Sequence, residues 1–450
     1  MLITNAKLIT WEVENRILEG YALYYESDKI VDIGPEAELI TKYPQAKRLD
    51  ANGQYVMPGN ICAHTHFYGA FARGMAIPGE APSKFIEILR KLWWPLDMAL
   101  DADAVMYSAL VCLLDAIRHG TTTLFDHHAS PNFIDGSLDV IANAVERSGL
   151  RAVLSYEVTD RNGSKGAEAG IRENVRFIKS KMSHPNSMIQ AAFGLHAPLT
   201  LSDKTLEACR EAKPEGTGFH LHVAESKDDT ASVLKKAHTL PIDWLNRYDI
   251  LGPKTIIAHG VHLSESELDQ LAETGTWVTH QPRSNMNNAV GVAQVESMLD
   301  KGIRVGLGND GFSNAMWEEW KTTYLVHKLV HQDPRWMNGD TVVDIAIYNN
   351  SALANTYFSE AAVGVLEPGA YADLIFVDYN PFTPMNAGNL PWHIVFGFHE
   401  SMVTTTIAAG QILMRDRKIL SLDEDAITHK ALELAPQVWE RYQEFVGTYN

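Results

Sequence analysis

The chain of 450 residues is long enough for about three average domains, or for one large α/β barrel with an accessory unit. Its 38 Lys and Arg residues against 56 Asp and Glu residues give a net charge of -18, which repels nucleic-acid phosphates and anionic lipid surfaces. We therefore expect a small-molecule partner and neither a nucleic-acid polymer nor a membrane.

The cysteines are odd in number, far apart and without Cys-x-x-Cys spacing, which indicates reduced core residues: Cys62, Cys112 and Cys209. The first residues alternate and carry charge, unlike a signal peptide. The longest apolar run, Ala104–Leu114, is interrupted by Asp115 and is shorter than the roughly 20 residues that cross a bilayer. These features predict a cytoplasmic protein.

Short strand patterns separated by turn residues fill the chain up to residue 56: Leu2–Thr10, Tyr21–Glu26, Lys29–Ile33 and Gly53–Val56. From Pro58 onward, strand patterns alternate with amphipathic helical patterns. We count eight strands in this alternation: Tyr55–Cys62, Thr121–Asp126, Arg151–Glu157, Ile189–Leu195, Gly218–Val223, Thr255–Ala258, Trp277–Thr279 and Arg304–Leu307. Helical patterns separate them, for example Ala104–His119, Leu138–Ser148, Ala167–Lys181, Asp203–Ala212 and Ala293–Lys301.

Eight strand and helix units are the number that closes a (β/α)₈ barrel, the TIM barrel, so the predicted fold class is α/β. After residue 360 the strand patterns return, at Met402–Ile407 and Gln411–Met414, before a helical pattern at Glu424–Tyr442. We expect both chain ends, residues 1–57 and 361–422, to form one composite β-sandwich domain. Residues 58–360 would then form the barrel, and residues 423–450 a C-terminal helix.

Histidines and one aspartate recur where these strands end. His64 and His66 alternate on one strand, so both project from the same face. His222, His259 and Asp310 lie at the ends of the fifth, sixth and eighth strands, and the carboxyl ends of barrel strands carry the active site. Neutral imidazoles with one carboxylate suit one divalent metal ion, Zn²⁺ first and Fe²⁺ or another ion as the alternative, with a position left for water.

Glu225 follows His222 by three residues and is expected to face the pocket beside the ion. There it could take a proton from a metal-activated water and deliver it to a ring nitrogen of the substrate. His259, if it is not a ligand, would orient the water together with Asp310. His220 shares a face with His222 and is the alternative ligand, although its deeper position in the strand favours packing or a supporting contact.

The remaining histidines divide by position. His196 and His280 end the fourth and seventh strands, which favours contact with the substrate. His127 and His128 follow the second strand, where substrate contact and solvation are both compatible with the sequence. Several others lie in expected helices or loops and are assigned structural roles: His238, His327, His331 and His429.

The order of several motifs resembles the amidohydrolase superfamily over essentially the whole chain: Val56-Met-Pro-Gly59 before His64-Thr-His66, Gly120–Asp126, His222-Val-Ala-Glu225, His259-Gly-Val-His262, Pro282–Asn285, Gly308–Asn314 and Gly369–Asp373. The resemblance implies the barrel with its composite β-sandwich. It implies a mononuclear metal site made of four residues: His64, His66, His222 and Asp310. It also implies that Glu225 is the proton shuttle and that His259 polarises the water or the developing oxyanion.

Within the superfamily the chain is most similar to the deaminase and chlorohydrolase branch, and especially to SsnA-type aminohydrolases, through His64–Gly74 and Trp93-Trp94. Binuclear relatives carry a carboxylated lysine on the fourth strand, but this chain has no lysine between Lys181 and Lys204. The branch usually has Asn-Pro where this chain has Gln281-Pro282. Guanine deaminases carry an arginine after the fourth strand, and its absence disfavours guanine as the substrate.

Arg73 and Arg283 are candidates for holding an acidic or carbonyl-bearing part of the substrate, because a guanidinium pairs with such groups bidentately. The alternative for each is a structural salt bridge. Trp93 is a further candidate contact.

The leading hypothesis is hydrolytic deamination of a heterocycle that bears an amino or imino group, such as a purine, pterin or pyrimidine. One alternative keeps the scaffold but cleaves a C–Cl or cyclic amide C–N bond. A second alternative is a catalytically silent binding protein, which predicts eroded ligand positions. A homodimer is compatible with such a barrel.

Overall fold

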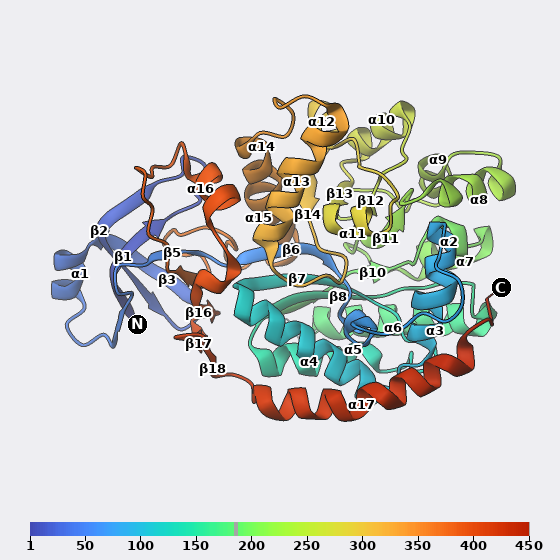
Figure 1. Ribbon diagram of the computed structural model, residues 1–450, viewed down its shortest axis with the longest axis horizontal. Coiled ribbons are helices and arrows are strands. Elements are labelled where there is room, and N and C mark those ends of the chain that lie inside the picture. Colours follow the sequence, from blue (N-terminus) through green and yellow to red (C-terminus); the bar gives the residue numbers. More distant parts are fainter. Residues whose placement is uncertain (184–187, 450) are drawn as a thin grey trace.

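The computed structural model describes residues 1–183 and 188–449. Figure 1 shows a sheet built from both ends of the chain on the left, and strands of the central part surrounded by helices on the right. The last helix, α17 (Glu424–Phe445), runs along the lower edge of the central part beside α4 (Ala102–His119).

The chain ends pair in one nine-stranded sheet, with strand order β18-β17-β16-β15-β5-β1-β2-β3 and with β4 beside β1. Strand β5 joins the two ends, because it pairs in parallel with β1 and antiparallel with β15. The strands are β1 (Leu2–Ile9), β2 (Ile17–Glu26), β3 (Lys29–Pro35), β4 (Arg48–Asp50), β5 (Tyr55–Pro58), β15 (Leu374–Val377), β16 (Val403–Ala408), β17 (Gln411–Arg415) and β18 (Lys418–Ile419).

The central part contains two parallel sheets, β6-β7-β8-β9 and β10-β11-β12-β13-β14. Val158 pairs in parallel with Leu195 where the sheets adjoin, and the amide of Asn309 donates to the carbonyl oxygen of His64 at 2.9 Å on the opposite side. Because all these strands run in parallel, their carboxyl ends lie together. The strands are β6 (Asn60–Thr65), β7 (Thr121–His128), β8 (Arg151–Tyr156), β9 (Ile189–Ala191), β10 (Phe193–Gly194), β11 (Phe219–Val223), β12 (Ile256–His259), β13 (Trp277–His280) and β14 (Val305–Leu307).

Every predicted central strand is present, but the first and the fourth are each divided between two sheets. The first is divided at Gly59, where an added Cβ would lie 2.3 Å from the Thr122 side chain. Pro58 therefore ends β5 in the nine-stranded sheet, and Asn60 begins β6 in a parallel sheet. The fourth is divided at Ala192, where the chain passes from one parallel sheet to the other.

The helices occupy the connections that the sequence predicts. A capping box between Ser264 and Glu267 begins the helix that follows β12. The helices are α1 (Glu36–Lys42), α2 (Phe85–Ile88), α3 (Trp94–Met98), α4, α5 (Ser137–Ser148), α6 (Gly163–Ser183), α7 (Asp203–Ala212), α8 (Lys227–Ala237), α9 (Pro241–Asn246), α10 (Glu265–Thr274), α11 (Pro282–Asn287), α12 (Val295–Asp300), α13 (Met316–His331), α14 (Gly339–Val343), α15 (Asn350–Tyr357), α16 (Leu390–Gly397) and α17. Short helical turns are η1 (Phe67–Ala72), η2 (Leu89–Trp93), η3 (Pro198–Thr200), η4 (Asp344–Asn349) and η5 (Glu400–Met402).

Helix α17 forms hydrogen bonds with two short segments, η1 and η2. The indole of Trp439 donates to the carbonyl oxygen of Phe71 in η1 at 2.9 Å. The hydroxyl of Tyr442 donates to the carbonyl oxygen of Lys91 in η2 at 2.5 Å. Among residues 1–183 and 188–449, no helix has both the length and the apolarity needed to span a membrane.

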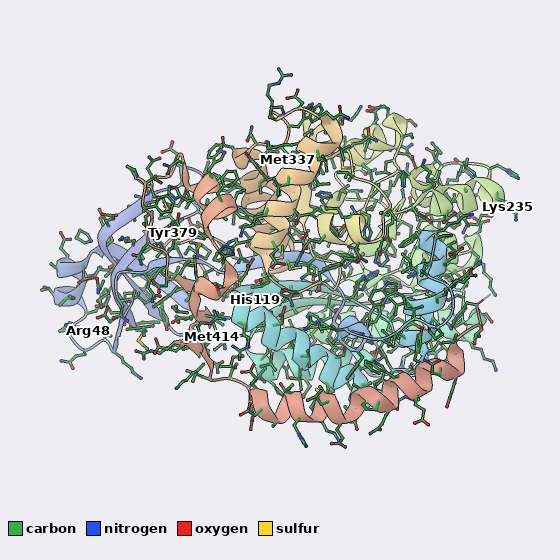
Figure 2. All side chains as sticks on the ribbon, viewed as in Figure 1. Arg48, His119, Lys235, Met337, Tyr379 and Met414 are labelled. Carbon is green, nitrogen blue, oxygen red and sulfur yellow. The ribbon has the colours of Figure 1, made fainter. Side chains whose placement is uncertain are left out.

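Buried side chains join the nine-stranded sheet to the central part. Met414 of β17 is fully buried in the same apolar core as residues of α4, and Figure 2 shows it where the two regions meet. The hydroxyl of Thr406 donates to the carbonyl oxygen of Ile117 at 2.8 Å. Nearby, Nε of Arg151 donates to Oδ2 of Asp373 at 3.0 Å, and both side chains are almost fully buried.

Replacing Asp373 with Ala is expected to lower the free energy of unfolding by about 3–5 kcal/mol, because the Arg151 charge would stay buried without its countercharge. Urea denaturation measures this difference. The matched control is Glu433→Ala, which removes an exposed ion pair with Lys430. Its free energy of unfolding should stay close to the wild-type value. An equal decrease in the free energy of unfolding in the two variants would contradict a stabilising role of the buried Arg151–Asp373 ion pair.

Candidate active site

Four side chains from three strand ends converge on one point. His64 and His66 come from β6 and its end, His222 from β11, and Asp310 from the turn after β14. Oδ1 of Asp310 lies 3.1 Å from Nε2 of His64 and 3.0 Å from Nε2 of His66, and the Nε2 atoms of His66 and His222 are 3.1 Å apart. One ligand atom from each residue lies within 4.8 Å of the other three. The sequence therefore predicted a set of residues that the fold brings together.

The hydrogen bonds of two of these histidines test whether the site fits a cation. Nδ1 of His66 donates to the carbonyl oxygen of His127 at 2.5 Å, and Nδ1 of His222 donates to that of His196 at 2.9 Å. Each Nδ1 thus carries a proton, because a carbonyl oxygen only accepts. In the neutral rings both Nε2 atoms then present lone pairs to each other, an arrangement that a positive ion between them stabilises. The donor set therefore fits a divalent metal ion.

The pKa values of two of the three histidines support the same reading. Burial lowers the pKa of His64 to about 4 and that of His222 well below its usual range, which favours the neutral ring that binds metals. Burial also lowers the pKa of His66, but the hydrogen bond with Asp310 and the charges of Asp310 and Glu157 outweigh burial and raise that pKa to about 9. Burial alone would raise the pKa of Asp310, but the neighbouring His259 and hydrogen bonds from His64 and His66 hold it well below its usual range. Asp310 is thus a carboxylate at neutral pH.

A second group adjoins the first through Asp310. Nε2 of His259 lies 3.5 Å from Oε2 of Glu225 and 3.8 Å from Oδ1 of Asp310. Three side chains of the α11 region hold these residues: Asn288 donates to Glu225 at 3.3 Å, Asn285 bonds Nδ1 of His259 at 2.9 Å, and Ser284 donates to Asp310 at 2.5 Å. Burial raises the pKa of Glu225 to about 7, close to the range in which a carboxyl both accepts and releases a proton.

Backbone strain marks the same strand ends. Ala224, His259 and Asp310 have φ of 52°, 74° and 56°, in the left-handed region that side chains other than glycine rarely adopt. Such residues persist where the surrounding structure holds them, and they cluster at functional sites. Here they turn the chain sharply after β11, β12 and β14.

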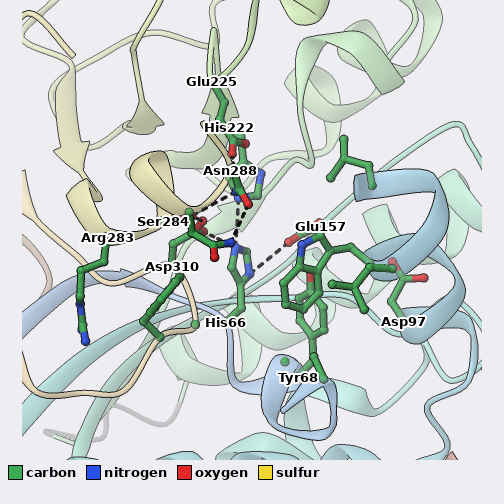
Figure 3. A pocket seen from close by; sticks show the side chains of 18 of the residues that line it. His66, Tyr68, Asp97, Glu157, His222, Glu225, Arg283, Ser284, Asn288 and Asp310 are labelled. Carbon is green, nitrogen blue, oxygen red and sulfur yellow. Dashed lines mark hydrogen bonds and ion pairs between the residues drawn. The ribbon is translucent and has the colours of Figure 1, made fainter. Parts of the chain in front are cut away.

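Three of the four side chains, His66, His222 and Asp310, line a cavity of about 600 Å³. Its walls include predicted contacts from three segments, namely Arg73, Trp93 and His196, together with Glu225 and Asp310. Figure 3 shows Asp310 to the left of His66, Glu225 above it, and Glu157 and Asp97 to its right. Arg73 is exposed, and its guanidinium forms no hydrogen bond or ion pair with the described residues.

The sequence profile of the amidohydrolase family matches residues 55–413. The chain belongs to the amidohydrolase family. Over 446 residues this amidohydrolase is 32% identical to 5'-deoxyadenosine deaminase of Methanosarcina mazei, a match that covers 98% of this chain and 99% of the relative. Over 399 residues it is 32% identical to 5-methylthioadenosine/S-adenosylhomocysteine deaminase of Haloarcula marismortui. This match covers 87% of this chain and 89% of the relative.

Among solved structures, an adenosine deaminase from Xanthomonas campestris with bound zinc superposes on this amidohydrolase with a TM-score of 0.85. The sequence identity is 23%, and the superposition covers 97% of this chain and 98% of that one. The similarity shows a shared fold.

Two predicted substrate contacts lie in other surroundings. Arg283 borders the cavity, but its guanidinium is paired with Glu319 at 2.5 Å and Glu318 at 2.6 Å, and in Figure 3 its side chain runs away from His66. This arrangement matches the salt-bridge alternative. His280 is fully buried, does not line the cavity, and lies 3.2 Å from His327 through their Nε2 atoms.

The histidines whose roles were left open are all buried. Nε2 of His220 lies 2.8 Å from Nδ1 of His64, so this ring supports His64 and stands outside the four-residue group. His127 stacks on His220 with ring centroids 4.6 Å apart, and His128 bonds Ser130 at 2.8 Å.

Sequence reasoning missed Glu157, although it ends the third predicted strand of this amidohydrolase. Its carboxylate borders the cavity, lies 3.4 Å from Nδ1 of both His66 and His127, and has an Oε1 atom without a hydrogen-bond partner among the described residues. Burial raises its pKa to about 8. Its position at the carboxyl end of a predicted barrel strand is the signal in the sequence that indicates it. The buried pair of Asp97 and Arg161 at the cavity wall carries no comparable signal in the sequence.

Proposed function

We propose that this amidohydrolase is a hydrolytic deaminase of the adenine ring in a nucleoside-type substrate. Water replaces the exocyclic amino group, the ring carbon becomes a carbonyl carbon, and ammonia leaves. The observation that carries the proposal is Glu225, placed beside His259 and Asp310 next to a complete set of metal-binding side chains. The names of the relatives that match almost the whole chain support the adenine ring.

His64, His66, His222 and Asp310 are proposed to hold one divalent ion, with Zn²⁺ as the first candidate and Fe²⁺ as the alternative. When bound, the ion supplies Lewis acidity and lowers the pKa of a water molecule towards neutrality. The chain fixes the ligand rings through the carbonyl oxygens of His127 and His196, which hold the tautomers of His66 and His222.

Glu225 is proposed to move the protons. Its carboxylate accepts a proton from the attacking water and gives it to the ring nitrogen beside the reacting carbon. Asn288 donates to Oε1 and leaves Oε2 facing His259 and the cavity. His259, held by Asn285, would place its Nε2 near the developing oxyanion, and Asp310, held by Ser284, would orient the water.

The cavity walls suggest how the rest of the substrate binds. Trp93 and Tyr68 offer apolar surface for the heterocycle, and the carboxyl group of Glu157 borders the same cavity. Arg73 is proposed to hold an anionic or carbonyl-bearing extension, whereas Arg283 already has its own carboxylates. His196 is proposed to contact the ring with its Nε2, since Thr200 occupies its Nδ1 at 2.7 Å.

A panel of substrates tests the proposal. Purified enzyme loaded with Zn²⁺ is incubated with 5'-deoxyadenosine, 5'-methylthioadenosine, S-adenosylhomocysteine and guanine, and released ammonia is measured. Ammonia is expected from the adenine nucleosides and not from guanine. Turnover of a chlorinated heterocycle with release of chloride, and none of the adenine nucleosides, would overturn the proposal.

The same panel separates the role of Arg73. Arg73→Gln should raise the KM for S-adenosylhomocysteine, which carries a carboxylate, by about tenfold or more, because a charged hydrogen bond is lost. The KM for 5'-deoxyadenosine should change little. Equal changes for both would assign Arg73 a structural role.

The fold is proposed to be a (β/α)₈ barrel at residues 58–360 with a composite β-sandwich domain from 1–57 and 361–422, followed by the helix in 423–450. The nine-stranded sheet formed by both chain ends supports the composite domain, and the backbone contacts between the two parallel sheets support the barrel. The cytoplasmic location and the homodimer stay predictions.

A further inference from the structure

A second cluster of metal-binding side chains lies away from the cavity, on helices α12 and α13. His327 and His331 are four residues apart on α13 and therefore project from the same face. Their ring centroids are 6.4 Å apart with an interplanar angle of 27°. Glu296, at the start of α12, faces them, and one ligand atom from each of the three residues lies within 4.8 Å of the other two.

Glu296 has a free oxygen at this position. Its Oε2 accepts from Nδ1 of His327 at 3.0 Å. Its Oε1 is buried and has no hydrogen-bond partner among the residues that the structure describes. A buried carboxylate oxygen left unpaired is costly, and binding a cation satisfies it.

His327 is also oriented as metal-ligating imidazoles are. Its side chain is fully buried, and its Nε2 lies 3.2 Å from Nε2 of His280 at the end of β13. Ligating histidines characteristically have their second nitrogen engaged by another group, which fixes the ring. His280 would thus position His327.

We infer that Glu296, His327 and His331 form a second divalent metal site, separate from the four-residue group in the cavity. Two imidazoles and one carboxylate are the ligands of a three-coordinate protein site for Zn²⁺. The ion takes the place of the proton on Nδ1 of His327, and the ring binds in its neutral form with its one proton on Nε2, which donates to Nε2 of His280. His331 is exposed and stacks on Trp336 at 3.8 Å, so the fourth position opens to water.

Zinc stoichiometry tests the inference. Metal-free protein is dialysed against buffered Zn²⁺, and bound metal is measured by elemental analysis in the wild type, in His331→Ala and in Glu296→Gln. His331 is exposed, so its removal leaves the core intact. The control is His429→Ala, an exposed histidine on α17. Wild type and control should bind one more ion per chain than His331→Ala, and Glu296→Gln should bind this ion at least about tenfold more weakly.

Deaminase activity should be the same in His331→Ala, His429→Ala and the wild type, because His331 lies outside the cavity lining. Co²⁺ gives an independent readout: the absorption of a four-coordinate ion should fall in His331→Ala relative to the control. Equal zinc content in His331→Ala and His429→Ala would overturn the inference and leave the cluster as a hydrogen-bonded helix contact.

Discussion

Replacing Glu225 with Gln is expected to lower kcat by about 10²- to 10⁴-fold, the usual contribution of a positioned general acid and base. Gln has the same shape and its amide oxygen still accepts from Asn288, but it takes up no proton at neutral pH. The KM and the zinc content should therefore stay close to wild type. Steady-state ammonia release and elemental analysis of the same preparation measure all three quantities.

Glu318→Gln is the matched control for this prediction. Glu318 also borders the cavity, but its carboxylate pairs with Arg283 at 2.6 Å and is about half exposed. Its loss should leave kcat near the wild-type value. If Glu225→Gln loses zinc along with activity, the effect belongs to the metal site and the assignment of Glu225 as the proton carrier fails.

The convergence of the four residues proposed to bind the metal could be predicted because it follows from two local rules. Alternation on a strand places His64 and His66 on one face, and the ends of parallel strands meet on one side of a sheet. No knowledge of distant contacts is needed to apply either rule. The same rules reach Glu157, which directly follows β8.

Other features depend on partners far away in the sequence. The division at Gly59 arises because Thr122 approaches that position from another strand. Arg283 forms ion pairs with Glu318 and Glu319, which lie on α13. His280 forms a hydrogen-bond contact with His327 of the same helix. Local patterns predict that a side chain stands at a strand end. They do not predict which neighbouring helix provides its ion-pair or hydrogen-bond partner.

Removing His222 is expected to lower the zinc affinity of the four-residue group in the cavity by more than about 100-fold. Even the loss of an outer hydrogen-bond partner of a ligand lowers metal affinity by about 10- to 100-fold. His222→Ala leaves Nε2 of His66 without the nitrogen that faces it at 3.1 Å. Deaminase activity should fall to background at zinc concentrations that saturate the wild type. The thermal unfolding temperature should also lose its increase on addition of zinc, because an ion that binds only the folded state stabilises it.

His222→Ala and the variants compared with it are best made in the His331→Ala background, so that zinc bound by α12 and α13 does not contribute. His262→Ala is the control, because His262 follows β12 and lies outside the cavity lining, and it should keep the zinc response. His220→Ala distinguishes a ligand from its support. His220 meets the four-residue group at the far nitrogen of His64, so its loss should weaken zinc binding by about 10- to 100-fold and leave activity recoverable with excess metal. If zinc restores His222→Ala as well as it restores His220→Ala, His222 is not a ligand and the site has a different composition.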